Sequence, residues 1–242
     1  MPDLIFADPR LAAIYDDIDG DRRDLGHYEA IIEGLGARSV LDIGCGTGVL
    51  GCRLAARGIT VTAVDPAQAS LDVARSMPGA DRVTWLLGDA TMLPVLAVDA
   101  VTMTGNVAQV FMSDEEWSAT LIGAHAALGD GGHLVFETRD PSYRGWEEWT
   151  GERSISISDT VAGRVEHWVE LTNVALPLVS FRRSFRFIES SDVITSNSTL
   201  RFRDREEITE SLSVNGFTID VVRDAPDRPG REFVVIAHSA PR

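Results

Sequence analysis

The chain has 242 residues, of which 44% are hydrophobic and 24% are charged, and its formal net charge is −15 at pH 7. This length and composition exclude a largely disordered chain and suit one large domain, or one domain with an insert. The negative charge repels phosphate backbones and anionic lipid surfaces, so we expect neither nucleic acid nor a membrane as a partner.

Several kinds of chemistry are excluded by residues that the sequence lacks. All 22 basic residues are arginine, so a lysine Schiff base and the lysine of a phosphate-binding P-loop are impossible. Cys45 and Cys52 are the only cysteines, too few for a disulfide framework and without the spacing of a metal site. No signal peptide or membrane-length apolar run is evident. We therefore expect a cytoplasmic protein without a metal.

The first part of the chain alternates between patterns typical of helices and of strands. A helix is expected over 24–36, with further helices over 48–58, 67–77 and 113–129. The last of these opens with Ser113 and Glu116, the two residues of a capping box. Strands are expected over 39–44, 60–65, 82–88, 98–104 and 132–138. This order predicts a doubly wound, mostly parallel sheet.

After Thr138 the period changes to two, which indicates antiparallel strands. Such strands are expected over 165–171, 181–188 and 192–202, followed by a helix that begins at Asp204 and by strands over 217–222 and 231–238. The fold class is therefore α/β, a Rossmann-like seven-stranded sheet with a small antiparallel insert after the fifth strand. We place the main domain at 1–145 and 203–242, and the insert at 146–202.

The segment "VLDIGCGTG", from Val40 to Gly48, leads an apolar strand into a glycine-rich turn. Such a turn lets a ligand approach the backbone closely. "GTGVLG" from Gly46 matches the dinucleotide-binding pattern, and Asp65 lies where a ribose-binding acid is expected. On this motif alone, a nicotinamide-dependent oxidoreductase is one interpretation, and tight packing between strand and helix is another.

Acidic residues at the ends of three strands favour a different ligand. Asp42, Asp65 and Asp89 end or follow the first three strands, so they line one edge of the sheet. An anionic dinucleotide is disfavoured there, whereas a ligand with ribose hydroxyls, an amine and positive charge is favoured. The alternative for Asp42 and Asp89 is that they only cap loops.

Together, "VLDIGCGTG", "AVDP", "GDA" and "GGHLVFE" resemble the class I S-adenosylmethionine-dependent methyltransferases in order and approximate spacing, from about Tyr15 to the C-terminus. The later antiparallel insert resembles that of small-molecule enzymes of this family. The resemblance implies S-adenosylmethionine as cofactor and S-adenosylhomocysteine as product. It also implies a set of cofactor-binding residues: Tyr15, Asp42, Gly44, Cys45, Gly46, Asp65, Pro66, Ala67, Asp89, Ala90, Thr104, Gly105 and Asn106.

In this set Asp65 is expected to accept from the ribose hydroxyls and Asp89 from the adenine amine, while Tyr15 is expected to close over the cofactor. Thr104, Gly105 and Asn106 are expected beside the departing methyl group.

The expected reaction is in-line methyl transfer to nitrogen or oxygen of a small molecule, which chiefly requires alignment and exclusion of water. Arg139, Tyr143 and His167 are the candidate catalytic residues, with Glu137 considered beside them. Arg139 could hold an acidic group of the acceptor or form a structural ion pair with Asp140 or Glu137.

Three alternatives stay open. His167 could serve as a base or as a core residue, and the insert could cover the acceptor or pair two subunits in a homodimer. A non-catalytic cofactor-binding module is the alternative to an enzyme.

Overall fold

The computed structural model describes residues 1–20 and 22–240, and within them two β-sheets are found. The larger has seven strands in the order β10-β11-β5-β4-β1-β2-β3. Its strands are β1 (Ser39–Ile43), β2 (Thr60–Asp65), β3 (Val83–Leu87), β4 (Val98–Met103), β5 (Leu128–Arg139), β10 (Phe217–Asp224) and β11 (Glu232–Ser239). The first five run parallel, and β11 is antiparallel to both β5 and β10. The predicted fold class is confirmed.

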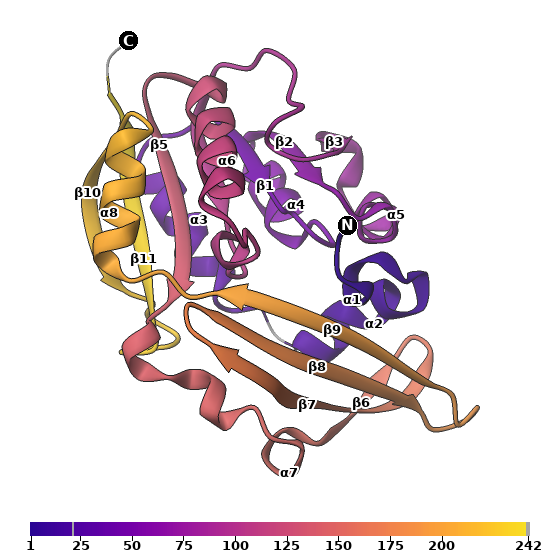
Figure 1. The fold of residues 1–242 in the computed structure, drawn as a ribbon. Coiled ribbons are helices and arrows are strands. Elements are labelled where there is room, and N and C mark those ends of the chain that lie inside the picture. Colours follow the sequence, from indigo (N-terminus) through magenta and orange to yellow (C-terminus); the bar gives the residue numbers. More distant parts are fainter. Residues whose placement is uncertain (21, 241–242) are drawn as a thin grey trace.

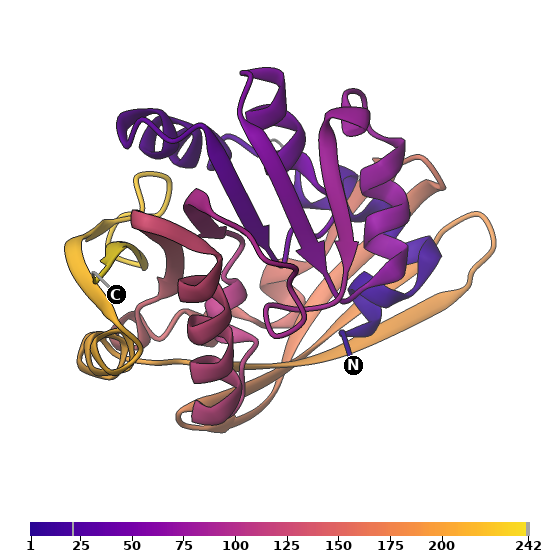
Figure 2. The same ribbon diagram turned by 90° about the horizontal axis from the view of Figure 1, so that it is seen from above.

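Helices cover both faces of this sheet, as Figures 1 and 2 show. One face packs against α6 (Asp114–Ala127) and α8 (Arg205–Val214), with Trp117 and Leu212 fully buried. The other packs against α3 (Leu25–Gly34) and α4 (Val49–Ala56), with Ile32 and Leu54 fully buried. α5 (Gln68–Ser76) packs beside β2 and β3. Burial of the strands on both faces explains their nearly continuous apolar sequences.

The capping residues expected from the sequence form the hydrogen bonds of capping boxes at the starts of α6 and α8. Ser113 and Asp204 each accept from the backbone of a glutamate three residues later, and that glutamate accepts from the cap in return. These reciprocal bonds fix where α6 and α8 begin.

The second sheet is antiparallel, with the order β6-β7-β8-β9. Its strands are β6 (Ser156–Thr160), β7 (Gly163–Ala175), β8 (Leu178–Phe187) and β9 (Val193–Arg201). We call it the roof sheet, because Figure 1 shows it crossing beyond the end of β5. All four strands fall within 146–202, the range expected for the insert. The segment between β5 and this sheet holds three short helices: η3 (Pro141–Tyr143), η4 (Gly145–Glu148) and α7 (Gly151–Ser154).

Two N-terminal helices, α1 (Leu4–Ala7) and α2 (Pro9–Asp19), lie between α5 and the roof sheet. The roof side of this contact is an apolar cluster in which Leu11 and Ile14 pack with Val165 and Phe185. The backbone N–H of Ile5 donates to Ser196 Oγ on β9, at 2.9 Å. The N-terminus therefore joins the roof sheet to the main domain.

Three details differ from the sequence-based expectation. The helices α1 and α2 and the strand β6 had not been predicted, because their segments are short or lack a clear apolar period. The fifth strand is also longer than 132–138, since β5 begins at Leu128, immediately after α6. Among residues 1–20 and 22–240, no helix has both the length and the apolarity needed to cross a membrane.

Candidate functional site

The candidate site lies at the carboxyl ends of the parallel strands. β1 pairs with β2 on one side and with β4 on the other, so the strand order reverses at β1. Ligands of open α/β sheets bind at such a reversal, outside the carboxyl ends of the strands. The glycine turn after β1 therefore occupies the position where this fold binds ligands.

The turn depends on glycine for its backbone shape. Gly44, Gly46 and Gly48 have φ angles of +70°, +54° and +81°, which L side chains rarely adopt. A Cβ at Gly48 would overlap the Trp85 ring and lie 2.8 Å from the Cβ of Ala74. The N–H groups of Gly44 and Cys45 both donate to the Val64 carbonyl, at 2.8 and 3.2 Å, and so fasten the turn to β2.

Asp65 at the end of β2 joins two segments of the candidate site. Its Oδ2 accepts from the N–H of Gly46 and its Oδ1 from the N–H of Ala67, each at 2.8 Å. Pro66 is exposed and Ala67 is buried. Burial raises the pKa of Asp65, against the lowering effect of the two backbone donors. Each carboxylate oxygen keeps further lone pairs for a ligand.

Asp42 on β1 is buried within the sheet, at 1% exposure. Thr102 on β4 donates its hydroxyl to Asp42 Oδ1 at 2.7 Å. Burial raises the pKa of Asp42 to about 7, and the nearby Asp65 also raises it. Asp42 therefore carries a proton in part of the molecules at neutral pH.

Asp89 and Ala90 follow β3. Asp89 is exposed, and its Oδ1 accepts from the N–H and the hydroxyl of Thr91 at 2.8 and 2.5 Å. Ala90 is buried against α6, where a Cβ at Gly123 would overlap its carbonyl oxygen. Asp89 thus caps its own turn, and the other carboxylate oxygen has no partner among the described residues.

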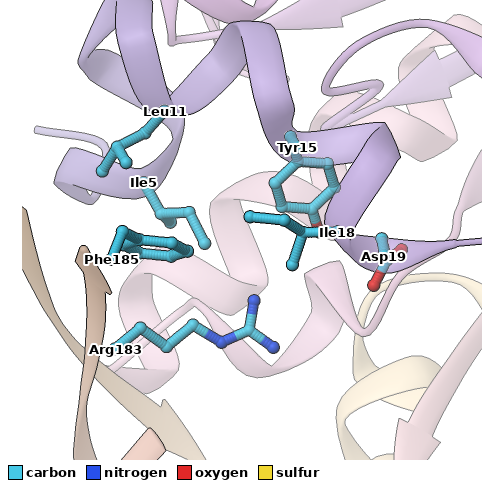
Figure 3. Close-up of a pocket in the computed structure, with 7 residues that line it drawn as sticks. All are labelled: Ile5, Leu11, Tyr15, Ile18, Asp19, Arg183 and Phe185. Atoms are coloured by element: carbon cyan, nitrogen blue, oxygen red, sulfur yellow. The ribbon is translucent and has the colours of Figure 1, made fainter. Parts of the chain in front are cut away.

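Tyr15 lies on α2 and faces the roof sheet, where it lines a small hollow with Ile18 and Phe185 (Figure 3). The next residue of the helix, Asp16, is tied to the glycine turn, because Thr47 Oγ1 donates to Asp16 Oδ1 at 2.7 Å. The Tyr15 ring packs against Phe6 with 5.5 Å between ring centres, and burial raises the pKa of its hydroxyl. Asp16 and Thr47 were not singled out in the sequence, although they fix the aromatic residue that was.

The loop after β4, from Thr104 to Asn106, is held by Glu137 of β5. Glu137 Oε1 accepts from the N–H groups of Gly105 and Asn106 at 2.6 and 3.2 Å. The Tyr28 hydroxyl of α3 donates to the other oxygen. Burial raises the pKa of Glu137 to about 7, and the charge of Glu232 adds to the rise.

Asn106 has a left-handed backbone with φ of +63°. Its Nδ2 lies 3.4 Å from an oxygen of Glu232, whereas its buried Oδ1 has no hydrogen-bond partner in the described part of the chain. An unsatisfied buried acceptor is costly, and a ligand's donor would remove that cost.

Arg139, at the end of β5, forms an ion pair, but not with the two residues considered from the sequence. Its Nε lies 3.3 Å from Glu232 Oε1, and its Nη1 donates to Gln109 Oε1 at 2.9 Å. The guanidinium also lies over the Trp149 ring, 5.8 Å from its centre. Burial lowers the pKa of Arg139, although Glu232 opposes this.

A cavity of about 180 Å³ opens beside Arg139. Tyr143, on η3, and Trp149 line it together with Glu232 and Arg228. The Tyr143 hydroxyl donates to Glu148 at 2.9 Å, so its ring is held at the rim. The structure thus brings together two of the three candidate catalytic residues, Arg139 and Tyr143.

His167 is not among the residues that line this cavity. It lies on β7 of the roof sheet. Its cross-strand neighbour is Phe185, which packs against the N-terminal helices. Its Nε2 is 3.0 Å from Ser158 Oγ. Burial lowers the pKa of His167, and the charge of Arg183 lowers it further, so the imidazole is neutral at pH 7. Its contacts suit either interpretation made from the sequence.

The sequence reasoning missed the partners of the site residues: Thr102, Tyr28, Gln109 and Glu232. Thr102 follows and Glu232 precedes an apolar stretch of its strand, which is the one signal that could have marked these buried polar residues.

Comparison with known proteins gives consistent similarities. A family described as a methyltransferase domain matches residues 40–132. An uncharacterized methyltransferase of Mycobacterium tuberculosis is 33% identical over 201 residues, which cover 74% of this chain and 75% of that protein.

Solved structures share the fold. The CcbJ methyltransferase from Streptomyces caelestis has a TM-score of 0.78 and 20% identity, covering 98% of this chain and 97% of that one. An amino pentose methyltransferase from Micromonospora echinaspora, solved with S-adenosylmethionine bound, has a TM-score of 0.71 and 22% identity, covering 92% and 94%.

Proposed function

Because the chain belongs to the class I S-adenosylmethionine-dependent methyltransferases, we propose that it methylates a nitrogen or an oxygen of a small-molecule acceptor. Membership of this family excludes two alternatives from the sequence analysis, a nicotinamide-dependent oxidoreductase and a non-catalytic cofactor-binding module. The cofactor is S-adenosylmethionine. We propose three further points: the class of acceptor, the residues that bind it, and an in-line displacement of the methyl group.

The residues at the strand ends fit this cofactor chemically. A buried carboxylate at Asp65 with lone pairs left over suits two neighbouring hydroxyl donors, as a ribose presents. The partnerless Oδ1 of Asn106 suits a cationic or amine donor. A Cβ at Gly46 would meet nothing within 4 Å, so the backbone there leaves room for a ligand to approach closely.

We therefore propose that the cofactor is held by the set expected from the sequence. Asp65, Pro66 and Ala67 would hold the ribose end, and Asp89 and Ala90 the adenine. Asp42 would help to hold the cofactor at the glycine turn, and Tyr15 on α2 would cover the cofactor. The loop of Thr104, Gly105 and Asn106, fastened by Glu137, would border the methyl group.

When bound, S-adenosylmethionine supplies a methyl carbon on positive sulfur, which a lone pair of nitrogen or oxygen displaces in line. The task of this chain is then to align the acceptor and exclude water. Glu137 contributes by fixing the loop after β4 through two backbone bonds. A rigid loop holds the reacting groups at a constant separation.

A small acceptor is supported by the cavity beside Arg139, the single observation that carries this part of the proposal. Its volume of about 180 Å³ and its polar and aromatic lining suit a small molecule. Tyr143 would contact the acceptor at the rim, and Arg139 would hold a polar or anionic group. The sugar N-methyltransferase KedS8, with a TM-score of 0.76, and the amino pentose enzyme named above act on small molecules by their names.

The acceptor atom determines whether a base is needed. A neutral amine attacks without one, whereas a hydroxyl requires a proton acceptor. His167 is the proposed acceptor of that proton, since its lowered pKa keeps the imidazole neutral. His167→Gln should then impair O-methylation and leave N-methylation of an amine nearly unchanged.

The proposal is tested by incubating the protein with S-adenosylmethionine and a panel of small amines, amino sugars, phenols and hydroxy acids. Mass spectrometry should detect a product heavier by one CH₂, with equal formation of S-adenosylhomocysteine. An isotopically chiral methyl group should arrive inverted. Methylation of a protein or nucleic acid, with none of any small molecule, would contradict the proposal.

The roof sheet is proposed to cover the acceptor, and pairing of two subunits through this sheet is the second reading. The mass of the protein in solution, measured by light scattering with and without cofactor, decides the latter. A monomer at all concentrations would refute the dimer.

A further inference from the structure

Gln109 is a buried amide between the roof sheet and the cavity beside Arg139. It ends the short helix η2 (Val107–Gln109), which follows the loop proposed to border the methyl group, and it is 0% exposed. A buried amide requires partners for both its oxygen and its nitrogen. The Gln109 Oε1 accepts from Arg139 Nη1 at 2.9 Å, and its Nε2 lies 3.5 Å from the Arg201 carbonyl at the end of β9. These contacts fix the orientation of the amide, because a guanidinium can only donate and a carbonyl can only accept.

The backbone around Gln109 is held by Arg203, which follows β9 and is 2% exposed. The Arg203 Nη1 donates to the carbonyl of Ala108 at 3.2 Å, and its Nη2 donates to the carbonyls of Phe111 and Ser113 at 3.0 and 3.2 Å. Hydrogen bonds from one planar guanidinium to three carbonyls fix this segment against the end of the roof sheet. The Gln109 amide is therefore presented to β5 from a rigid backbone.

The Arg139 guanidinium is held by one carboxylate and one neutral amide. Glu232 lies 3.3 Å from Nε, but the same carboxylate also accepts from Arg228 Nη1 at 2.8 Å. Gln109 adds no charge, and the Arg139 Nη2 has no partner among residues 1–20 and 22–240. Arg139 has the least exposed side chain of the three arginines that line the cavity, at 26%. It therefore presents free, charged donors to the cavity at a partly desolvated position.

The two acids that line this cavity besides Glu232 are engaged with neighbouring groups. Asp140 Oδ1 accepts from the N–H of Ser142 at 2.8 Å. Glu148 accepts from the Tyr143 hydroxyl at 2.9 Å and lies 3.5 Å from Arg231. In the described part of the chain neither acid contacts the guanidinium at the end of β5, which stays available to an acceptor.

We propose that Gln109 is a specificity-determining residue: it positions Arg139 without neutralising it, and so selects an acceptor that carries a carboxylate or phosphate besides its nucleophilic atom. This inference rests on the proposed function and names the substrate class. Such an oxyanion accepts charge-assisted hydrogen bonds from the free donors of Arg139, and the cavity of about 180 Å³ has room for it. A carboxylate at position 109 would instead form a second ion pair with Arg139 and repel an anionic acceptor.

The test uses the full chain loaded with S-adenosylhomocysteine and four probes of similar size. Benzoate and phenyl phosphate are anions, benzyl alcohol is neutral, and benzylamine is a cation. Titration calorimetry should show that the wild type binds at least one anion about tenfold more tightly than benzyl alcohol. Gln109→Glu should weaken binding of that anion about tenfold and strengthen binding of benzylamine.

The matched control is Asn197→Asp, because this exposed amide also accepts from an arginine, Arg182, at 3.1 Å. It introduces the same charge beside a guanidinium outside the cavity and should change the anion affinity less than about twofold. In an Arg139→Met background, Gln109→Glu should have no further effect on anion affinity, since the two residues act as a unit.

Gln109→Met tests the positioning without introducing a buried charge. It removes the oxygen that holds Arg139, so it should weaken anion binding about threefold and leave benzylamine binding unchanged.

Four results would overturn the inference: no preference of the wild type for an anion, intact anion affinity in both Gln109 variants, an equal loss in Asn197→Asp, or an equal effect of Gln109→Glu with and without Arg139. Because calorimetry needs no turnover, failure to methylate any small molecule would count against the proposed function alone.

Discussion

Thr102 on β4 donates a 2.7 Å hydrogen bond to Asp42 on the neighbouring strand β1, at a point where both side chains are buried. The two residues are paired in the parallel register. This bond partly offsets the burial that raises the pKa of Asp42 to about 7. A carboxyl with that pKa changes its charge within the physiological range, next to the turn proposed to bind a cationic cofactor.

Affinity for S-adenosylmethionine should therefore rise with pH. A cation placed near Asp42 favours the ionised form and lowers its pKa, so binding expels a proton. The affinity should increase between pH 5.5 and 7, by up to about tenfold per unit, and level off above. Titration calorimetry in buffers of different ionisation enthalpy measures both effects. Asp42→Asn should flatten the dependence, and an equally steep profile in that variant would exclude Asp42.

Asp65→Ala should weaken cofactor binding by about 1.5–3 kcal/mol, because charge-assisted hydrogen bonds to the ribose are lost. Asp65→Asn separates this effect from the turn, since its amide oxygen still accepts from a backbone N–H. Asp72→Ala, an exposed acid on α5, is the control and should leave affinity unchanged. Unaltered calorimetric affinity in a folded Asp65→Asn variant would remove this residue from the site.

Gly48→Ala should destabilise the protein more than Gly79→Ala. Both glycines have φ of +81°, so both variants incur the left-handed strain of about 1–2 kcal/mol. Only at Gly48 does the new Cβ meet Trp85 and Ala74, which adds roughly 1–3 kcal/mol of overpacking. Urea unfolding measures the difference. Equal losses would mean that the Trp85 ring moves away freely.

Glu137→Gln should stabilise the protein relative to the wild type as pH rises. The pKa of this carboxyl is about 7 in the folded protein against an ordinary 4.5, so the folded state binds the proton more tightly. Its ionisation therefore costs stability progressively between these values, about 3 kcal/mol by pH 8. Denaturant unfolding at pH 5 and pH 8 measures this. Glu152→Gln, at an exposed position, should show no such trend.

Arg139→Met should raise the apparent KM of the acceptor much more than that of the cofactor, once an acceptor has been found. The reason is its position beside the cavity at the end of β5. Steady-state kinetics with both substrates varied separates the two constants. Arg223→Met, exposed on β10, serves as the control. Equal changes in both KM values, or no change in either, would mean that Arg139 has only a structural role, in its ion pair with Glu232.

Much of the main domain was predictable because its signals are local. The strand before Gly44 is apolar, the capping boxes at Ser113 and Asp204 involve residues three apart, and the left-handed turn needs glycine wherever it occurs. Asp65 could be placed at a strand end because it ends the strand-like segment "TVTAVD". Such features depend on neighbours along the chain, which the sequence displays directly.

Other features depend on residues far apart in the sequence. β6 had escaped prediction because its polar segment is ordered by pairing with β7, not by its own apolar pattern. The N-terminal helices are fixed by the roof sheet, through contacts such as that of Ile5 with Ser196, 191 residues away. Hydrogen bonding and burial supplied by distant strands override weak local preferences.

The sequence by itself determined the fold class and the acids at the strand ends through patterns within short segments, and it determined the cofactor family through the resemblance of its motifs to known methyltransferases. Only the tertiary structure decided how those groups are paired. It joined Tyr28 to Glu137 and paired Arg139 with Glu232. Charge and proton affinity depend on burial and on distances of a few ångströms, which are set by packing between elements remote in the chain.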